Sequence, residues 1–269
     1  MVLAQIRHAL YVYGKLQLLH LRTHLEYEAD FWIGIIGVAL THGAGFVFIW
    51  TVFQRVPAVA GWTLWEIALL YALSVIPRGL VELLCDGQWT LRRMVNRGEF
   101  DRLLVRPISP ALQLITQISS IHGFGSILLG LTILARAISE LQLAWGVWQY
   151  GFLLATLLSS VVLLGSLNFA SNCIAFWDPS ANSAFPFLAQ QPLEFVKFPI
   201  SLYSRFIQAL LTWVLPFAFM SYYPGLVLLG KPLATPWLGY AAPLAGLAML
   251  LVACFFWRRG LLRYQGVGH

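Results

Sequence analysis

Residues 91–110, LRRMVNRGEFDRLLVRPISP, form a charged island between two long apolar runs. The island holds five arginines together with Glu99 and Asp101. Charged segments beside apolar spans lie outside the bilayer, and an arginine excess marks the cytoplasmic side. Phe, Leu and Met do not suit a loop that only faces water, so we expect a short helix that contacts a soluble partner. A solvated, positively charged loop is the simpler alternative.

The composition indicates an integral membrane protein. The 269 residues are 59% hydrophobic and 10% charged, with a mean hydropathy of +0.75, whereas soluble domains carry roughly 25% charged residues. The formal net charge of +6 comes from Lys and Arg beside apolar runs, where they set orientation, so it does not indicate nucleic-acid binding. Cys85, Cys173 and Cys254 form no C-x-x-C pair and no metal-ligand spacing.

The apolar runs around the island predict an all-α membrane protein with six transmembrane helices. Five spans can be read directly, at residues 31–53, 64–84, 111–134, 147–176 and 236–257. Two readings stay open for the sixth. Hydropathy alone places it at residues 206–222, whereas the alternative places it in the less apolar segment 184–197. In the alternative, a broken re-entrant hairpin follows at the outer face, where irregular backbone must lie against protein or a cavity.

Residues 2–26 alternate apolar and basic positions at helical spacing, which predicts an amphipathic helix in the cytoplasmic interface. A cytosolic helix packed on the protein itself is the alternative. Arg7 and Lys15 interrupt any apolar core of a signal peptide. Six spans put both termini in the cytoplasm, where Arg258 and Arg259 then add to the positive charge of the inner side.

A few polar residues lie within the predicted spans. Polar groups in lipid need partners, and most of them bridge helices, so contact with a substrate is the less common reading. Arg78 and Glu82 are four residues apart and can pair on one helix face as a structural contact. The polar candidates for a substrate pathway are His42, His122, Asn168 and Asn172. The small residues expected to let helices approach closely are Gly123, Gly125 and Gly130.

The sequence offers no catalytic or metal motif. Residues 225–231, GLVLLGK, imitate a phosphate loop, but Pro232 stands where the magnesium-binding Ser or Thr is required. No H-E-x-x-H, no G-x-S-x-G and no metal-spaced cluster is present. Intramembrane charge is sparse, so the acidic relay of a proton- or sodium-driven carrier is missing. We expect a protein that is not an enzyme and binds no metal or cofactor itself.

Residues 98–107, GEFDRLLVRP, resemble the G-x-(apolar)-D-x-L-L-x-R-P segment of permease subunits in the ABC-2 exporter family, especially a branch whose members have about this chain's length. Residues 61–63, GWT, look like the entry to the second span in that branch. Residues 198–203, FPISLY, and the stretch from Pro216 to Pro224 look like its outer segment. The motifs occur in the family's order, and the resemblance covers essentially the whole chain.

The resemblance implies one transmembrane permease domain, residues 1–269, without ATPase activity of its own. It implies an interfacial helix at 1–26, a coupling segment at 91–107, span five at about 183–198 and an outer-leaflet hairpin at 200–229. Such permeases pair with a second permease, identical or homologous, and with two copies of an ABC ATPase that binds ATP and Mg. The membrane would be the inner membrane of a prokaryote, with both termini cytoplasmic, with membrane lipid as a partner and with no nucleic acid.

The expected activity is ATP-driven export of an unidentified cargo, amphipathic or lipid-like in character. In the coupling segment, we expect apolar anchors at Met94, Phe100, Leu103 and Leu104. Polar rim contacts are expected from Arg92, Arg93, Arg97 and Asp101, and the remaining residues expected to take part in coupling are Gly98, Glu99 and Arg106. A membrane scaffold or assembly factor and a secondary transporter are the competing functions; an ATPase companion would favour the exporter over both.

Overall fold

The computed structural model describes residues 11, 13–19, 28–178 and 184–266, and the described chain is all-helical apart from turns and one isolated bridge. Its long helices are α2 (Glu28–Phe53), α3 (Leu64–Cys85), α7 (Gly123–Glu140), α8 (Val147–Asn172) and α13 (Ala242–Arg263). The short helices are η1 (Asp86–Thr90), α4 (Leu91–Asn96), α5 (Asp101–Leu104), α6 (Pro110–Ile115), η2 (Cys173–Phe176), α9 (Ala184–Gln190), η3 (Gln191–Lys197), η4 (Ile200–Leu202), α10 (Arg205–Ala209), η5 (Leu210–Val214), η6 (Phe217–Phe219), α11 (Tyr222–Leu228) and α12 (Pro236–Tyr240).

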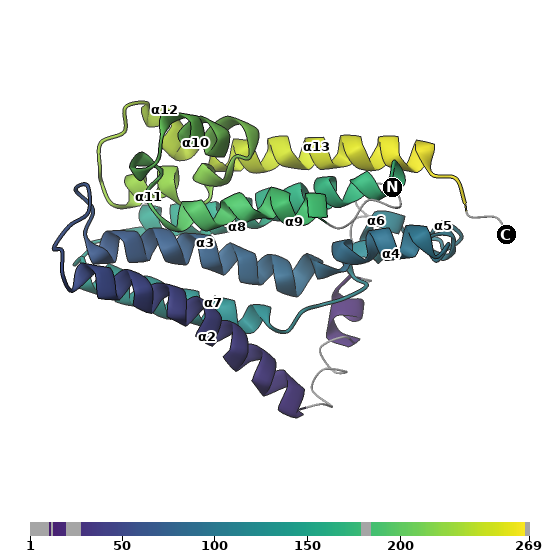
Figure 1. Ribbon diagram of the computed structural model, residues 1–269, viewed down its shortest axis with the longest axis horizontal. Helices are drawn as coiled ribbons and strands as arrows, with labels where there is room; N and C mark the ends of the chain where they lie inside the picture. Colours follow the sequence, from purple (N-terminus) through teal and green to yellow (C-terminus); the bar gives the residue numbers. More distant parts are fainter. Residues whose placement is uncertain (1–10, 12, 20–27, 179–183, 267–269) are drawn as a thin grey trace.

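Among the described residues, five helical stretches are long and apolar enough to cross a membrane, and one bent pair brings the number to six if it counts as a span. The stretches Phe31–Phe53 and Val147–Phe176 have the boundaries expected from the sequence. The long helices run side by side, while α4, α5 and α6 lie at one end of the bundle and α10, α11 and α12 at the other (Figure 1). The chain therefore has the layout of a multi-pass membrane protein.

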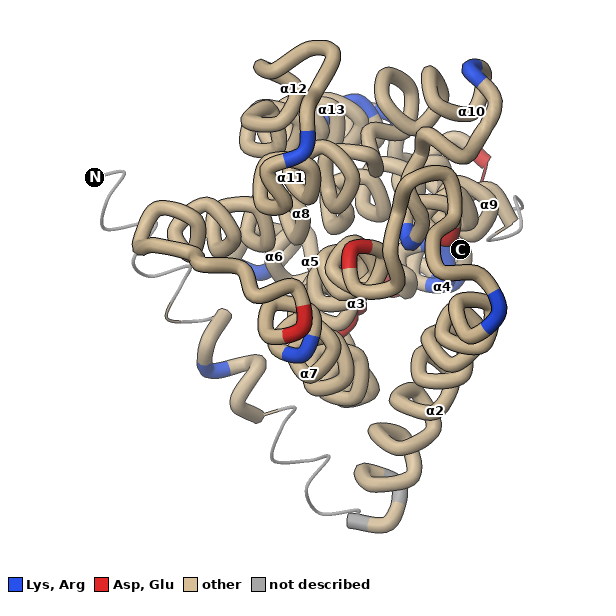
Figure 2. The backbone as a smooth tube through the Cα atoms, turned by 90° about the vertical axis from the view of Figure 1, so that its left-hand side faces the viewer, with Lys and Arg blue, Asp and Glu red and all other residues tan. Residues whose placement is uncertain are grey.

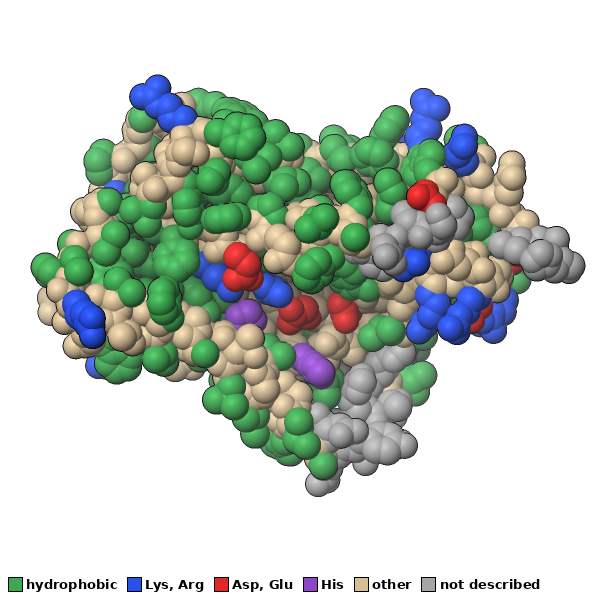
Figure 3. All heavy atoms as spheres, in the orientation of Figure 1, with side chains coloured by type: hydrophobic (Ala, Val, Ile, Leu, Met, Phe, Trp, Pro, Cys, Tyr) green, Lys and Arg blue, Asp and Glu red, His purple; other side chains and the backbone are tan. Residues whose placement is uncertain are grey.

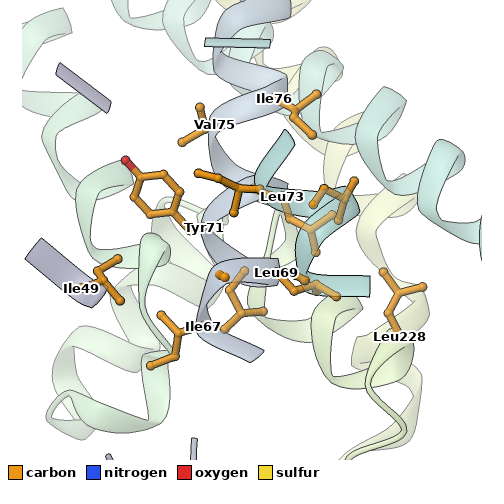
Figure 4. Close-up of a cluster of buried hydrophobic side chains, with 14 of the residues drawn as sticks. Ile49, Ile67, Leu69, Tyr71, Leu73, Val75, Ile76 and Leu228 are labelled. Carbon is orange, nitrogen blue, oxygen red and sulfur yellow. The ribbon is translucent and has the colours of Figure 1, made fainter. Parts of the chain in front are cut away.

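Helix α3 is the centre of the bundle. Seen from the end that carries α10–α12, it is surrounded by α2, α7, α8 and α11 (Figure 2). Its core side chains converge with Ile49 of α2 and Leu228 of α11 (Figure 4). In this span 72% of the apolar window is buried, against 11% in α2. Helix α2 thus leaves most of its apolar surface for lipid or for another protein.

Small residues bring α3, α7 and α2 into close contact. A Cβ atom on Gly123 would lie 2.3 Å from the carbonyl oxygen of Gly79 in α3, and one on Gly125 would lie 2.4 Å from that of Ile35 in α2. A Cβ atom on Gly130 would lie 2.6 Å from the Ile76 side chain. The expectation that these three glycines permit close helix approach is confirmed, since only glycine fits at such contacts.

The third span begins at Gly123 and not near residue 111 as expected. Residues 110–115 form the separate helix α6, which packs so closely on η1 that a Cβ atom on Gly87 would lie 2.2 Å from the Leu114 carbonyl oxygen. The connecting chain is fixed to the end of α3, because the Ser119 hydroxyl donates to the Leu83 carbonyl at 2.7 Å. This polar contact outweighs the apolar character of the stretch. Helix α7 alone rises about 27 Å, which is close to the thickness of a bilayer core.

The last span also differs from its expected bounds. Residues 236–240 form the separate helix α12, and α13 runs from Ala242 to Arg263. Pro243 lies in the first turn of α13, where its missing N–H costs nothing. The helix continues past Trp257 through Arg258 and Arg259, because long basic side chains can reach water from the end of a span.

Residues 206–222 do not form the straight span that hydropathy alone predicts. The segments Arg205–Val214 and Phe217–Leu228 are bent by 78° at Leu215 and Pro216, because proline lacks an N–H and disfavours helix in the residue before it. The preceding segment consists of α9 and the 3-10 helix η3, seven residues each, which together rise about 24 Å. That is short of the roughly 30 Å of a bilayer core.

The N-terminal prediction lies largely outside the described residues. Residues 13–19 are helical, and the Tyr13 hydroxyl and the Gln17 amide both donate to the Leu84 carbonyl, at 2.8 and 3.1 Å. The interfacial helix at residues 1–26 therefore stays a prediction, with residues 13–19, about two helical turns, attached to the end of α3.

Candidate functional site

The charged island forms the bundle end at which α4, α5 and α6 meet the C-terminal end of α13 (Figure 1). Helix α3 leads through η1 directly into α4, so that Leu64–Asn96 reads as one helical stretch. Thr90 supports the junction through a 2.7 Å hydrogen bond from its hydroxyl to the Gly87 carbonyl. A force on α4 would therefore be transmitted into the central helix without an intervening flexible loop.

A turn after α4 reverses the chain. Gly98 has a φ of 68°, in the left-handed region that favours glycine, and the Phe100 amide donates to the Met94 carbonyl at 3.2 Å. The expected single helix near residues 91–105 is thus two short helices, α4 and α5. The turn directs one side of the segment toward the bundle and the other outward, and we call these the inner face and the outer face.

The inner face is centred on Phe100, whose side chain is 0% exposed. Its ring lies 5.3 Å from that of Phe176, 6.0 Å from Trp257 and 5.0 Å from Tyr264, all in edge-to-face geometry. Aromatic pairs in this geometry stabilise by about 0.5–1.5 kcal/mol each beyond area burial. Phe100 thereby joins the segment to η2, to α13 and to the residue that follows α13.

The expectation that Met94, Phe100 and Leu103 are exposed anchors for a partner is wrong. All three are buried in one cluster with Leu91, Phe169 and Trp257. The chain's own aromatic rings provide the apolar environment that a partner was expected to provide. Of the four expected anchors, only Leu104 is exposed, at 44%.

Sequence reasoning missed Gln113, which fixes the other end of the inner face. Its buried amide donates to the carbonyl of Leu103 at 3.0 Å and to that of Ile108 at 2.8 Å. It thereby ties α6 to the end of α5 and to the loop after it. A lone glutamine in an apolar run carries no signal of this role.

The outer face carries charge and two apolar side chains. Val105 is 84% exposed and adjoins Leu104 at the tip, although the sequence reading did not single it out. The exposed basic residues of the segment are Arg93, Arg97, Arg102 and Arg106, while Arg92 is half-buried. Glu99 pairs with Arg102 at 3.7 Å, and such exposed pairs contribute little.

Asp101 faces the end of α13 and not the outer rim. Its carboxylate lies beside the Tyr264 hydroxyl, and burial together with this carboxylate raises the pKa of Tyr264 to about 12. A Cβ atom on Gly266 would lie 3.2 Å from the same carboxylate. At neutral pH the Tyr264 hydroxyl keeps its proton. The contact therefore joins a neutral hydroxyl to the Asp101 carboxylate, which suits a structural link.

A second polar group lies within the spans. Arg78 contacts Glu82 at 3.2 Å and Glu194 of η3 at 2.8 Å, and Lys197 pairs with the same Glu194. Lys197 also lies over the Tyr71 ring, and the Tyr71 hydroxyl donates to the His42 carbonyl at 2.6 Å. Acidic, basic and histidine side chains gather in the hollow between α2 and α9 (Figure 3). The expected Arg78–Glu82 pair is present, and Glu194 and Lys197 extend it.

The four polar candidates for a substrate pathway are not brought together by one set of contacts. The His122 ring packs against Gly34, 2.8 Å from where a Cβ atom would lie. Asn172 donates to the Asn168 carbonyl within α8 at 2.8 Å, and both side chains are buried. Within the residues that the structure describes, no cluster of His, Cys, Asp or Glu could hold a metal ion.

Comparison with known proteins identifies the family. Residues 39–268 match the family described as "ABC-2 family transporter protein". The matched part contains the charged island, the bent pair and all long helices except the start of α2. No curated protein and no solved structure gives a match. With the charged island at one end of the helical bundle and the bent pair at the other, the chain belongs to the ABC-2 family of transporter membrane proteins.

Proposed function

We propose that this chain is the non-catalytic permease subunit of an ATP-driven exporter, and that a separate ABC ATPase docks on its outer face. The observation that carries the proposal is the continuity of α3, η1 and α4, which joins an exposed surface directly to the most buried helix. ATP and Mg belong to the partner. ATP-driven closure of two ATPase copies would push α4 and α5, and α3 would pass the motion into the bundle.

The outer face has the composition of a docking surface. Leu104 and Val105 are apolar and exposed at the tip, with Arg97, Arg102 and Arg106 around them. A few apolar anchors inside a charged rim supply most of the affinity in such interfaces. The inner-face residues Met94, Phe100 and Leu103 act in this scheme by holding the segment on α13, and not by touching the partner.

The orientation follows from charge. Arg93, Arg97, Arg102 and Arg106 lie at the same end as Arg258, Arg259 and Arg263. The positive-inside rule places that end in the cytoplasm, together with both termini. The bent pair then forms an outer-leaflet hairpin in residues 200–229, with span five in the short segment 184–197. The membrane would be the inner membrane of a prokaryote.

In this proposal the second permease contacts the uncovered face of α2, and the cargo passes between the two subunits. Most of α2 is uncovered, and the Arg78–Glu194–Lys197 group faces the hollow beside it. Charge in lipid must be screened by protein, by water or by a ligand. A second permease covering this hollow would leave a passage with apolar walls and a polar centre, which suits an amphipathic or lipid-like cargo.

The test changes only the outer face. The double variant Leu104→Glu/Val105→Glu puts two negative charges at the tip, and Val56→Glu, at an exposed apolar residue of the loop after α2, is the matched control. We expect the double variant to insert normally but to lose co-purification of the ATPase and ATP-stimulated transport, whereas Val56→Glu keeps both. Normal ATPase association in the double variant would refute the docking role.

A topology map adds an independent check. In a variant whose three native cysteines are replaced by serine, a cysteine introduced at Arg97 is expected to react with a membrane-impermeant thiol reagent only from the cytoplasmic side. Labelling from the opposite side would overturn the orientation and with it the ATPase contact.

A further inference from the structure

A groove at the arginine-rich end is formed by α13, η2 and α4, next to the coupling segment. It has a volume of about 1210 Å³ and opens to the surroundings. Its basic residues are Arg259 and Arg263, one helical turn apart on α13, and its polar residues include Asn96 and Gln265. The Arg259 guanidinium lies 5.5 Å from the centre of the Phe255 ring. Neither arginine forms an ion pair with any residue that the structure describes, so both remain available to an anion.

A second, narrower cavity adjoins this groove on the side toward the middle of the bundle. Its volume is about 270 Å³, and it lies between α8, α9 and α13. Its lining includes Leu167, Ala170, Ala189 and Met249, which are apolar. The two cavities share Trp177 and Phe256, whose rings stand edge to face at 6.2 Å.

The charged lining residues of α13 lie toward its C-terminal end, although Leu262 between them is apolar. Met249 lines the inner cavity, Phe256 lies at the junction, and Arg259 and Arg263 line the groove. At 1.5 Å per residue, Met249 and Arg263 are each about 10 Å from Phe256 along the helix. Trp and Tyr prefer the level of lipid headgroups, which suits Trp177 at the junction, and arginine lies just outside that level. The order matches that of a membrane lipid, with its phosphate outside and its acyl chain inside.

We propose that the groove and the cavity together bind one anionic phospholipid from the surrounding leaflet. Arg259 and Arg263 bind the headgroup phosphate, Trp177 and Phe256 lie at the glycerol level, and one acyl chain enters the cavity between α8, α9 and α13. A free phosphate would leave the apolar cavity unused. A soluble protein would have to insert apolar side chains to the depth of Met249, inside a span. The lipid is therefore the occupant that uses both cavities.

The bound lipid would adjoin the inner face of the coupling segment. The groove is lined by Val95 of α4 and by Phe176 and Tyr264, two of the rings that enclose Phe100. Occupancy of the groove would hold η2, α4 and the end of α13 together. Lipid composition would in this way set how firmly the segment is attached to the bundle. This inference holds whether or not an ATPase docks on the outer face.

The test measures lipid retention on the full chain, purified in mild detergent. Native mass spectrometry is run with equal amounts of phosphatidylglycerol and phosphatidylcholine carrying the same acyl chains. We expect phosphatidylglycerol to be retained preferentially. The variant Arg259→Gln/Arg263→Gln should weaken its binding roughly 25-fold, because each basic side chain near an anionic lipid contributes about a fivefold factor. Equal retention of the two lipids would overturn the proposal.

Arg258→Gln is the matched control, because Arg258 is the neighbouring exposed arginine and lines neither cavity. The Arg258→Gln variant should keep the preference for phosphatidylglycerol. A loss of binding as large as that in Arg259→Gln/Arg263→Gln would mean that general positive charge attracts the lipid, and it would overturn the proposal. Arg259→Lys/Arg263→Lys keeps the charge and should keep most of the binding, which also guards against a glutamine pair that does not fold. Loss of the preference in this lysine variant would contradict the proposal.

The inner cavity is tested separately. Ala189→Trp fills it from α9 and should lower phosphatidylglycerol retention at least tenfold, with the melting temperature in lipid-free detergent unchanged. Retention as in the parent chain would show that no acyl chain enters. Glycerol 3-phosphate serves as the headgroup alone and should bind far more weakly than the lipid. Equal affinity would identify an anion site and overturn the lipid assignment.

Discussion

The two faces of the charged island differ in the surroundings of their apolar residues. On the inner face, Phe100 and Leu103 are buried against the chain's own η2 and α13. On the outer face, Leu104 and Val105 are exposed beside arginines. The two pairs are almost adjacent in sequence and equally apolar. The comparison teaches that an apolar residue in a charged island can be buried against its own chain or left exposed, and that only its neighbours in space decide which.

The largest expected effect comes from removing the central aromatic ring of the inner face. Phe100→Ala removes a fully buried ring between three others, and we expect a loss of about 3–5 kcal/mol in unfolding free energy. Phe206→Ala is the control, because that phenylalanine is 77% exposed, and it should change the value by less than about 0.5 kcal/mol. Unfolding by SDS titration in detergent micelles measures both. Equal effects would mean that the inner face is not the attachment.

The second test removes the polar attachment of the inner face. Gln113→Ala leaves the Leu103 and Ile108 carbonyls without their donor, and an unsatisfied buried polar group costs about 1–3 kcal/mol. Gln54→Ala, at an exposed position, is the control. The same SDS titration should separate the two variants. A Gln113 variant as stable as the control would mean that the end of α5 is held by packing alone.

The third test concerns the turn that separates the two faces. Gly98→Ala forces a Cβ atom into the left-handed region, at a cost of about 1–2 kcal/mol. Gly37→Ala is the control, since Gly37 is in α2 and its added Cβ atom would meet nothing within 4 Å. The control should be neutral or slightly stabilising. Proteolysis of the segment in detergent, followed over time, should be faster for the Gly98 variant only.

The smallest effect is expected on the outer face. Glu99→Gln removes a pair with Arg102 whose arginine side chain is 70% exposed, so the unfolding free energy should change by less than about 0.5 kcal/mol. Glu194→Gln is the comparison, because Glu194 holds both Arg78 and Lys197 within the bundle. If Glu99→Gln lowered the unfolding free energy more than Glu194→Gln, the ion pair on the outer face would matter more for stability than the one within the bundle, which would contradict the comparison.

The sequence predicted the parts that depend on composition along the chain. The apolar runs at 31–53 and 147–176 became the helical stretches expected of them, because a long apolar segment has few alternatives to a helix in a membrane. The close approach at Gly123, Gly125 and Gly130 was also foreseen. The start of the third span was not foreseen, since the Ser119 hydroxyl donates to the Leu83 carbonyl, 36 residues earlier, which no local pattern reveals.

Some features of the candidate site were likewise predictable from the sequence, and others were not. The location of the segment at one end of the bundle followed from its arginines, and the membership of the ABC-2 family followed from its motifs. The roles of Phe100 and Leu103 did not, because the rings of Phe176, Trp257 and Tyr264 come from residues far along the chain. Glu194 was likewise unrecognised as the partner of Arg78 across 116 residues.

The amino-acid sequence alone determined that this protein is helical, embedded in a membrane and divided by an arginine-rich segment between its second and third spans. These properties depend on the solvation of each stretch, which neighbouring residues set. The tertiary structure decided which face of that segment is buried, where α7 begins, and that α3 is the centre of the bundle while α2 stays uncovered. These depend on contacts between distant residues, whose free energies exist only once the helices have packed.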